Sequence, residues 1–204
     1  MPALPGVSRE TLDRLRAYAA LLERWTAVIN LVGAADRGHI WSRHVEDSLR
    51  LLPLIPPGAP RGIDLGSGAG LPGLVLAVAT GIPFDLVESD QRKAAFLQEA
   101  ARVTSAPVTV HATRIEGLPL APALLVTARA LAPLDALLTL AAPLLAPAGI
   151  ALLPKGARAG EELEQARRTW RMDVQQHLTP GQPGAILAIT GLHRIPTTSG
   201  AAHA

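Results

Sequence analysis

Five glycines stand among the thirteen residues of RGIDLGSGAGLPG, residues 61–73, directly after a short apolar run. Glycine has no β-carbon, so Gly66, Gly68 and Gly70 permit positive φ angles and let a ligand approach the backbone. Glu88 follows the next apolar run, where a carboxylate can accept both hydroxyls of a ribose. The pattern predicts a ribose-containing ligand at a glycine-rich turn.

Two cofactors match this turn. Gly68, Gly70 and Gly73, with Glu88 twenty residues after the first of them, fit the G-x-G-x-x-G pattern of nicotinamide dinucleotide sites. Asp64, two residues ahead of the first glycine, instead completes D-x-G-x-G-x-G, which is typical of S-adenosylmethionine sites. A carboxylate there suits an ammonium and a sulfonium better than an anionic pyrophosphate. The chemistry favours S-adenosylmethionine, while a dinucleotide or a turn without a ligand stays open.

The elements that must position these residues alternate along the chain. Apolar runs predict strands, and apolar residues three or four apart predict helices. Apolar strands separated by helices indicate a doubly wound α/β fold, whose ligands bind beyond the carboxyl ends of its parallel strands. The predicted strands are 62–65, 84–87, 108–110, 124–127, 150–153 and an additional edge strand 185–190; the predicted helices between and after them are 72–80, 91–104, 133–145 and 160–170.

The first part of the chain is predicted to be a helical extension. Apolar residues recur at helical spacing over 8–31, with Ser8 as a plausible N-cap, and again over 41–52. The proline-rich stretch 53–60 then reads as a linker. We therefore expect the extension and linker over 1–58, a cofactor-binding domain over 59–195 and a tail over 196–204.

Composition narrows the possible classes. The chain has 204 residues, enough for one domain with a buried core, and its net charge of +2 permits nucleic-acid binding without arguing for it. It contains no cysteine, which excludes disulfides, thiolate metal sites and thiol catalysis. Residues 1–10 lack a secretory pattern, and the uncharged stretch 136–154 predicts helix, turn and strand instead of a membrane span. We expect a cytoplasmic protein without membrane association.

Seven segments carry a resemblance to a known family: ERWTAVINL (23–31), RHVEDSL (43–49), DLGSGAGLPGLVLA (64–77), LVESDQRKAAFL (86–97), TRIEG (113–117), TARALAPL (127–134) and PKG (154–156). In these segments the chain resembles the small-subunit ribosomal RNA guanine-N7 methyltransferases, also called the glucose-inhibited division protein B family. The resemblance implies a Rossmann-like class I methyltransferase domain with S-adenosylmethionine as cofactor. Its implied partner is 16S ribosomal RNA, free or in the small ribosomal subunit, methylated at N7 of one guanosine.

The resemblance also assigns residues. It implies that Gly66 and Leu71 contact the cofactor, that Ile115 and Glu116 flank its adenine, and that Arg129 reaches the site after the fourth strand. Arg129 is the first choice for a functional basic residue, because its fork can hold the O6 edge of guanine, the cofactor carboxylate or a phosphate. The alternative is that Arg129 only covers the end of the sheet.

His44 and Asp47, three residues apart, share one face of the predicted helix 41–52. A metal site would need further ligands, and none is suitably spaced, so we expect no metal. Arg43, His44 and Asp47 either pack the extension over the cofactor crevice or touch RNA, or His44 and Asp47 form a pair on the helix surface. Lys155 is a further candidate for RNA contact, with solvated lysine as the alternative.

The residues that this chain lacks are ones that methylation of a ring nitrogen does not need. Neutral guanine N7 has a lone pair and no proton, so its methylation needs orientation and no general base. Methylation at pyrimidine C5 commonly uses cysteine, and methylation of exocyclic amines commonly uses an Asn/Asp-Pro-Pro-aromatic loop where this chain reads ARALAP. A hydroxyl or carboxylate of a small molecule stays possible. So do an NAD(P)-dependent oxidoreductase, for which the single tyrosine, Tyr18, is awkwardly placed as a proton donor, and a binding module without turnover.

Overall fold

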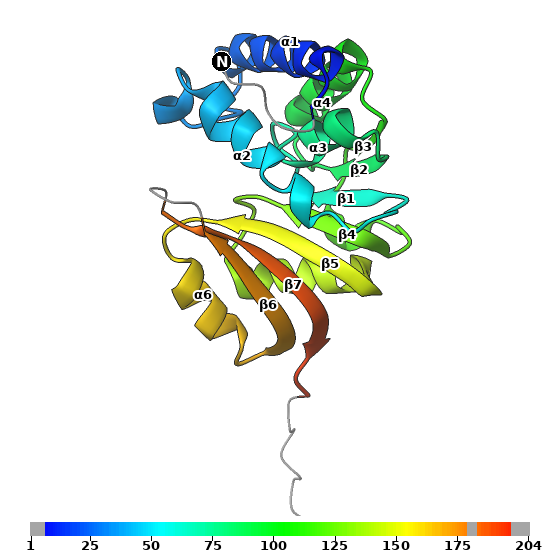
Figure 1. The fold of residues 1–204 in the computed structure, drawn as a ribbon, viewed down its shortest axis with the longest axis vertical. Coiled ribbons are helices and arrows are strands. Elements are labelled where there is room, and N and C mark those ends of the chain that lie inside the picture. The colour runs from blue at the N-terminus through cyan, green and yellow to red at the C-terminus, as the bar shows by residue number, and fades with distance from the viewer. Residues whose placement is uncertain (1–6, 179–182, 197–204) are drawn as a thin grey trace, which may run out of the picture.

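The computed structural model describes residues 7–178 and 183–196, and within them one seven-stranded sheet forms the centre of the molecule (Figure 1). Its strand order is β3-β2-β1-β4-β5-β7-β6. Neighbours from β3 to β5 run parallel, whereas β7 is antiparallel to both β5 and β6. The strands are β1 (Gly62–Leu65), β2 (Phe84–Val87), β3 (Val108–His111), β4 (Ala123–Ala128), β5 (Leu145–Lys155), β6 (Trp170–Leu178) and β7 (Ala185–Arg194).

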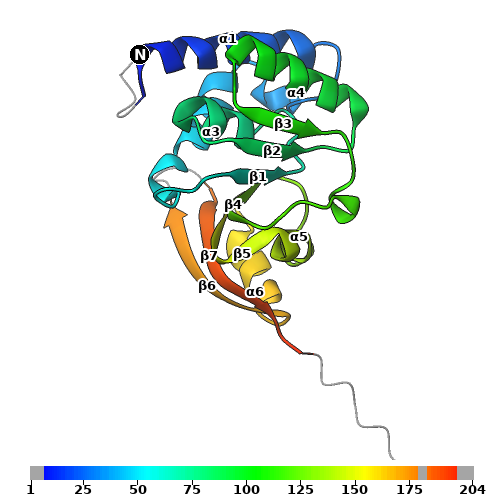
Figure 2. The same cartoon turned by 90° about the vertical axis from the view of Figure 1, so that its right-hand side faces the viewer.

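Helices cover both faces of this sheet, which confirms the predicted α/β, doubly wound class (Figure 2). Side chains alternate between the faces along each strand. In β2, Phe84 and Leu86 join the hydrophobic cluster with α1, α3 and α4, whereas Val87 joins the cluster with α5 and α6. The helices are α1 (Arg9–Thr26), α2 (Glu46–Leu49), α3 (Gly73–Thr80), α4 (Gln91–Thr104), α5 (Leu134–Ala141) and α6 (Ala159–Ala166).

The strand order reverses between β1 and β4, which are neighbours in the sheet but lie far apart in the chain. The connections from β1 lead to β2 on one side, and those from β4 lead to β5 on the other. A crevice therefore opens beyond the carboxyl ends of β1 and β4, where such sheets bind ligands. The glycine turn and Arg129 both lie at this edge, because they directly follow β1 and β4.

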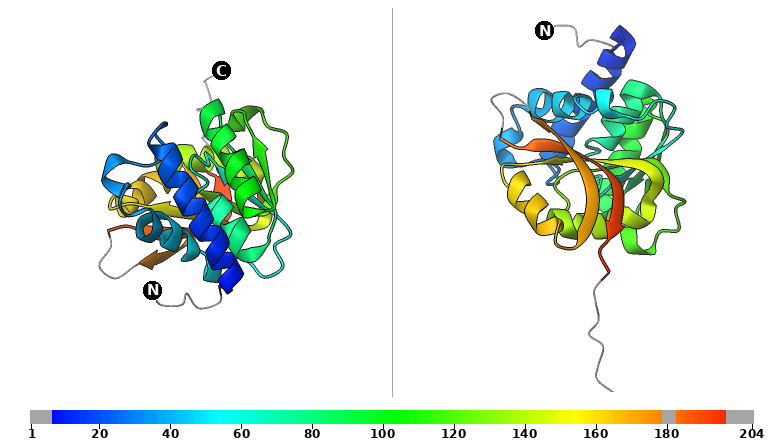
Figure 3. Two further views of the ribbon diagram at one scale, coloured as in Figure 1. Left: turned by 90° about the horizontal axis from the view of Figure 1, so that it is seen from above. Right: turned by 60° about the horizontal axis from the view of Figure 1, so that its bottom comes forward.

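The helical extension packs on the sheet's helices and shares their hydrophobic cluster. The Ser8 hydroxyl accepts a hydrogen bond from the Thr11 amide at 3.1 Å and caps α1, as predicted. Figure 3 shows α1 passing beside α4, and its buried face includes Leu15, Tyr18 and Leu22. A π-helical turn (Trp41–Val45) precedes α2. The predicted boundary after residue 58 stays a prediction, and the tail beyond residue 196 lies outside the described residues.

Two features of the sheet differ from the sequence prediction. The run 185–190 is part of β7, which lies between β5 and β6 and is not an edge strand. The edge strand on this side of the sheet is β6, which no apolar run predicts because only one of its faces is apolar.

The uncharged stretch 136–154 forms α5, a short 3₁₀ turn (Ala142–Leu144) and β5, as predicted. Among the described residues no helix is both long and apolar enough to span a bilayer.

Candidate functional site

The turn after β1 has the left-handed backbone that its glycines predict: φ is 63° at Gly66, 55° at Gly68 and 85° at Gly70. A β-carbon at Gly66 would lie 2.5 Å from a methyl carbon of Leu131, and one at Gly70 would lie 2.9 Å from the β-carbon of Leu74. Conformation and crowding both require glycine at these two positions. Gly68 has no such crowding, because its nearest neighbour is a backbone oxygen 3.8 Å away.

A cavity of about 460 Å³ lies beyond this turn, within the usual range for small-molecule sites. Its walls come from the turn, the end of β2 and the segments that follow β3 and β4. Asp64 and Gly70 are not among the lining residues, whereas Lys93 and Arg114, to which the sequence assigned no role, are. The predicted cofactor residues that line the cavity are Gly66, Gly68, Leu71, Glu88, Ile115, Glu116 and Arg129.

Glu88 connects the two halves of the cavity wall. One carboxylate oxygen accepts a hydrogen bond from the Gly68 amide at 2.9 Å, and the other accepts one from the Asp90 amide at 2.8 Å. Glu88 is 8% exposed and lines the cavity. Each oxygen has more than one acceptor site, so the carboxylate that holds the turn retains acceptor capacity for a ligand hydroxyl.

Asp64 lies fully buried behind the turn. One of its carboxylate oxygens accepts a hydrogen bond from the Thr127 hydroxyl at 2.6 Å, and the other has no hydrogen-bond partner among the described residues. Burial raises the pKa of Asp64 from 3.8 to about 6. Asp64 thus supplies buried negative charge beneath the turn and no surface of the cavity. No motif assigns a role to Thr127, and the signal available for it is a hydroxyl within the otherwise apolar run of β4.

Arg129 lines three cavities. It lines the 460 Å³ cavity, a second of about 640 Å³ formed with residues 130–133 and 154–158, and a third of about 100 Å³ against α2 and β7. Its Nη2 donates to Nδ1 of His44 at 3.1 Å, which ties it to the helical extension. Burial lowers the pKa of the Arg129 guanidinium from its ordinary value.

The structure places the three RNA-contact candidates differently. Arg43 is exposed, whereas His44 is 7% exposed and points its ring inward to Arg129. Nε2 of His44 lies 3.6 Å from the Asp36 carboxylate, and burial, followed by the charge of Arg129, lowers the pKa of His44. Because Nδ1 accepts from Arg129, we interpret His44 as a neutral residue that orients this guanidinium.

Lys155 is buried in an internal ion pair. Its Nζ lies 2.7 Å from a Glu162 carboxylate oxygen and donates to the Ala132 carbonyl at 2.9 Å, and its side chain is 7% exposed. The same Glu162 oxygen accepts from the Leu134 amide at 2.9 Å. Lys155 therefore joins the end of β5 to the starts of α5 and α6, and its ammonium already has two acceptors within the protein; a contact of Lys155 with RNA stays a prediction.

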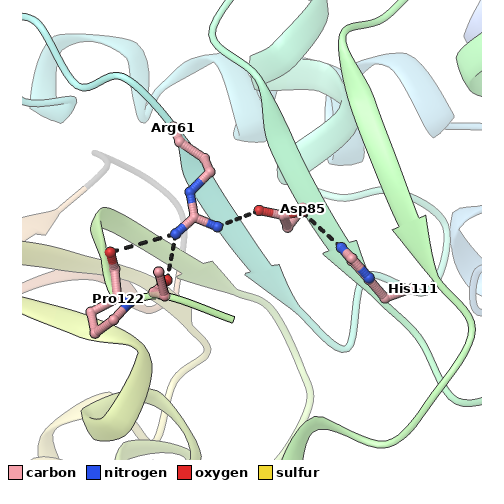
Figure 4. Close-up of polar contacts among 5 residues, drawn as sticks. Arg61, Asp85, His111 and Pro122 are labelled. Carbon is pink, nitrogen blue, oxygen red and sulfur yellow. Dashed lines mark hydrogen bonds and ion pairs between the residues drawn. The ribbon is translucent and has the colours of Figure 1, made fainter. Parts of the chain in front are cut away.

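A polar cluster anchors the segment that carries residues 113–116 of the cavity wall (Figure 4). Asp85 accepts from Arg61 at 2.5 Å with one oxygen and lies 2.7 Å from Nε2 of His111 with the other. Arg61 also donates to the carbonyls of Ala121 and Pro122, at the far end of the segment. The segment between His111 and Pro122, which includes residues 113–116 of the cavity wall, is thus held at both ends.

Comparison with known proteins decides the family. The family model described as rRNA small subunit methyltransferase G, GidB, matches residues 11–185. The chain belongs to this family. Ribosomal RNA small subunit methyltransferase G of Granulibacter bethesdensis is 54% identical over 196 residues, which cover 96% of this chain and 92% of that protein. The protein of the same name from Rhodospirillum centenum is 54% identical over 187 residues, which cover 91% of this chain and 86% of the relative.

Solved structures show the same fold at low sequence identity. A TehB-like SAM-dependent methyltransferase from Corynebacterium glutamicum has a TM-score of 0.57 at 17% identity, covering 86% of this GidB-family chain and 98% of its own. TYW2 of M. jannaschii in complex with AdoMet has a TM-score of 0.58 at 15% identity, covering 76% and 78%. The predicted family and the Rossmann-like methyltransferase fold are both confirmed. The oxidoreductase alternative receives no support from these relatives.

Proposed function

We propose that the protein is an S-adenosylmethionine-dependent methyltransferase that methylates N7 of a guanosine in 16S ribosomal RNA. Family membership supports the reaction class, the cofactor and the ribosomal RNA substrate. The target atom, N7 of guanine, is the one that the resemblance to the family implies, and the chemistry of the site is compatible with it. The proposed place of reaction is the cytoplasm, where the small ribosomal subunit is assembled.

The 460 Å³ cavity fits the cofactor in size and chemistry. The glycine turn offers bare backbone for the methionine portion, and Glu88 offers a carboxylate for the ribose hydroxyls. Ile115 and Glu116 are the proposed neighbours of the adenine. When bound, the cofactor supplies an electrophilic methyl group on a sulfonium. The buried charge of Asp64 favours a cation above the turn, although its side chain does not line the cavity.

Arg129 carries the argument for guanine N7. It stands directly after β4, between the cofactor cavity and the 640 Å³ cavity, where enzymes that methylate exocyclic amines place an acidic or amide side chain. A guanidinium only donates hydrogen bonds, and O6 of guanine, next to N7, only accepts them. Donation to O6 would turn N7 toward the methyl donor while leaving its lone pair free. His44 keeps the guanidinium in place, and no group has to remove a proton.

The 640 Å³ cavity is the proposed site of the target nucleotide. It shares Arg129, Ala130 and Leu131 with the cofactor cavity, and exposed Arg158 is one of its lining residues. Arg158 and the exposed Arg43 are suited to contact phosphates of the surrounding RNA. Lys155 lines the same cavity, but its pairing with Glu162 supports a structural role.

Transfer of a labelled methyl group tests the proposal. The purified protein is incubated with methyl-tritiated S-adenosylmethionine and either small ribosomal subunits or protein-free 16S ribosomal RNA from cells that lack the gene. The RNA is then digested to nucleosides and separated by chromatography. We expect the label in 7-methylguanosine, and the better of the two substrates identifies the natural one. Label in any other nucleoside, or in none despite cofactor binding, contradicts the proposal.

A further inference from the structure

We propose that Tyr18 of the helical extension is a positioning residue for the cofactor-binding turn; this inference rests on the proposed cofactor site. The Tyr18 hydroxyl donates to the Ala69 carbonyl at 2.6 Å, across 51 residues of sequence. Tyr18 is 0% exposed, and Ala69 lines the 460 Å³ cavity. A side chain outside the predicted cofactor-binding domain thus supports the floor of that cavity directly.

The hydrogen bond from Tyr18 to Ala69 lies in a stretch of backbone that its flanking glycines leave conformationally free. Ala69 lies between Gly68 and Gly70, which both have positive φ angles, and glycine loses more conformational freedom on ordering than any other residue. The Ala69–Gly70 peptide is held at both polar ends, because its carbonyl accepts from Tyr18 and its amide donates to the Ser67 carbonyl at 2.6 Å. Without the hydroxyl, one of these two constraints on the peptide orientation disappears.

The ring of Tyr18 is fixed independently of its hydroxyl. Its centroid lies 6.4 Å from that of Phe96, and the Trp25 ring in turn lies 5.7 Å from Phe96 in an edge-to-face arrangement. Phenylalanine at position 18 therefore keeps the aromatic packing and deletes one donor. Burial raises the pKa of the Tyr18 phenol, so the hydroxyl remains a donor over the whole working pH range.

The helical extension also contacts the site through His44, whose Nδ1 accepts a hydrogen bond from Arg129. Tyr18 acts on the cofactor side and His44 on the side of the target base, so their effects are separable. Loss of the Tyr18 hydroxyl should weaken cofactor binding, since the turn must be ordered on binding, and should leave turnover at saturating cofactor almost unchanged. A hydroxyl that only stabilised the fold would change neither quantity.

Tyr18→Phe in the full-length protein tests the inference by calorimetry with S-adenosylmethionine and by steady-state kinetics with small ribosomal subunits. We expect the Kd and KM for the cofactor to rise about fivefold to tenfold, the scale of one buried hydrogen bond, with kcat within about twofold of wild type. Thr104→Val is the matched control. It deletes a fully buried hydroxyl that donates to the Ala100 carbonyl at 2.7 Å in α4, and it should lower the melting temperature without changing the cofactor Kd.

Wild-type cofactor affinity in Tyr18→Phe, with a melting temperature lowered as in Thr104→Val, would overturn the inference and leave the proposed function intact. Failure of the wild-type protein to bind S-adenosylmethionine would overturn both. If Tyr18→Phe does not fold, fluorotyrosine gives the answer in the unmutated chain, because Tyr18 is its single tyrosine. The inference predicts that the one fluorine resonance shifts when cofactor is added, and an unchanged resonance contradicts it.

Discussion

Replacing Glu88 by alanine tests the cofactor site at its most connected residue. The carboxylate accepts from the Gly68 amide at 2.9 Å and from the Asp90 amide at 2.8 Å, and it is the proposed ligand of the ribose. The substitution leaves both amides without their partner and removes an acceptor from the cavity wall. Hydrogen bonds to a charged group contribute about 1.5–3 kcal/mol each. Because the two protein bonds exist without cofactor, only the ribose contact and the cost of reordering the turn enter the binding free energy.

We therefore expect Glu88→Ala to weaken S-adenosylmethionine binding by about 1.5–3 kcal/mol, which is about tenfold to 150-fold in Kd. Glu88→Gln keeps one acceptor oxygen and should fall between Ala and wild type. Calorimetry on the full-length protein measures both, and Glu23→Ala, which removes the same charge from an exposed position on α1, is the control. A folded Glu88→Ala protein with wild-type affinity would remove Glu88 from the site.

Three further predictions concern residues around the cavity. The pKa of Asp64 is raised from 3.8 to about 6, so the folded state binds its proton more tightly than the unfolded state, and the contribution of Asp64 to stability should fall by about 3 kcal/mol as pH rises from about 4 to 6. Urea unfolding should show that Asp64→Asn removes this contribution from the pH profile, and a slope equal to that of the wild type would contradict the assignment. Arg129→Ala should lower kcat by at least about tenfold, with a much smaller effect on the melting temperature than on turnover. The control, Arg171→Ala at an exposed position, should change neither quantity. Wild-type turnover in Arg129→Ala would mean that Arg129 only covers the end of the sheet. Lys155→Met should cost about 1–2 kcal/mol of stability, because the partly exposed Glu162 carboxylate loses its cation but keeps the hydrogen bond from the Leu134 amide, and the KM for RNA should change little. Adding Glu162→Gln should restore most of the loss, whereas a large rise in that KM without destabilisation would assign Lys155 to RNA contact.

The cofactor side of the site was predictable from sequence because its signals are local. The bounds predicted for β1, β2 and α4 agree with the structure, since short runs buried on both faces end at glycine, proline or a polar residue. The glycine angles follow from the absence of a β-carbon. Glu88 directly follows the predicted second strand, so the pattern of strands places it at the crevice, whereas the resemblance to the family assigned Arg129 to the site.

The rest of the site depends on contacts between distant residues, which spacing does not reveal. Helical spacing paired His44 with Asp47, but the π-helical turn over Trp41–Val45 changes the register, and His44 instead contacts Arg129, 85 residues away. The Tyr18 contact spans 51 residues and has no motif. Lys155 has the residue type of an RNA contact, yet its engagement with Glu162 is set by the packing of α6.

The missed strand β6 has a physical explanation as well. Its first residues, Trp170 to Gln175, alternate between buried or half-buried and exposed positions, as expected for an edge strand with one face on the core. Runs that are apolar throughout predict the parallel part of the sheet, but β6 has no such run. The predicted helix 160–170 includes only its first residue, Trp170, and no element is predicted over 171–178. The alternation of apolar and polar residues with a period of two is the signal from which β6 is predictable.

The central claim is that this protein methylates guanine N7 in 16S ribosomal RNA, and chemical cleavage in cells tests it most directly. N7-methylguanosine makes RNA labile to borohydride reduction followed by aniline, so 16S ribosomal RNA from strains with and without the gene is treated and its cleavage sites are mapped. The account predicts one cut that disappears on deletion, returns fully with the wild-type gene and returns at most weakly with Arg129→Ala. Identical cleavage patterns in the two strains would contradict it.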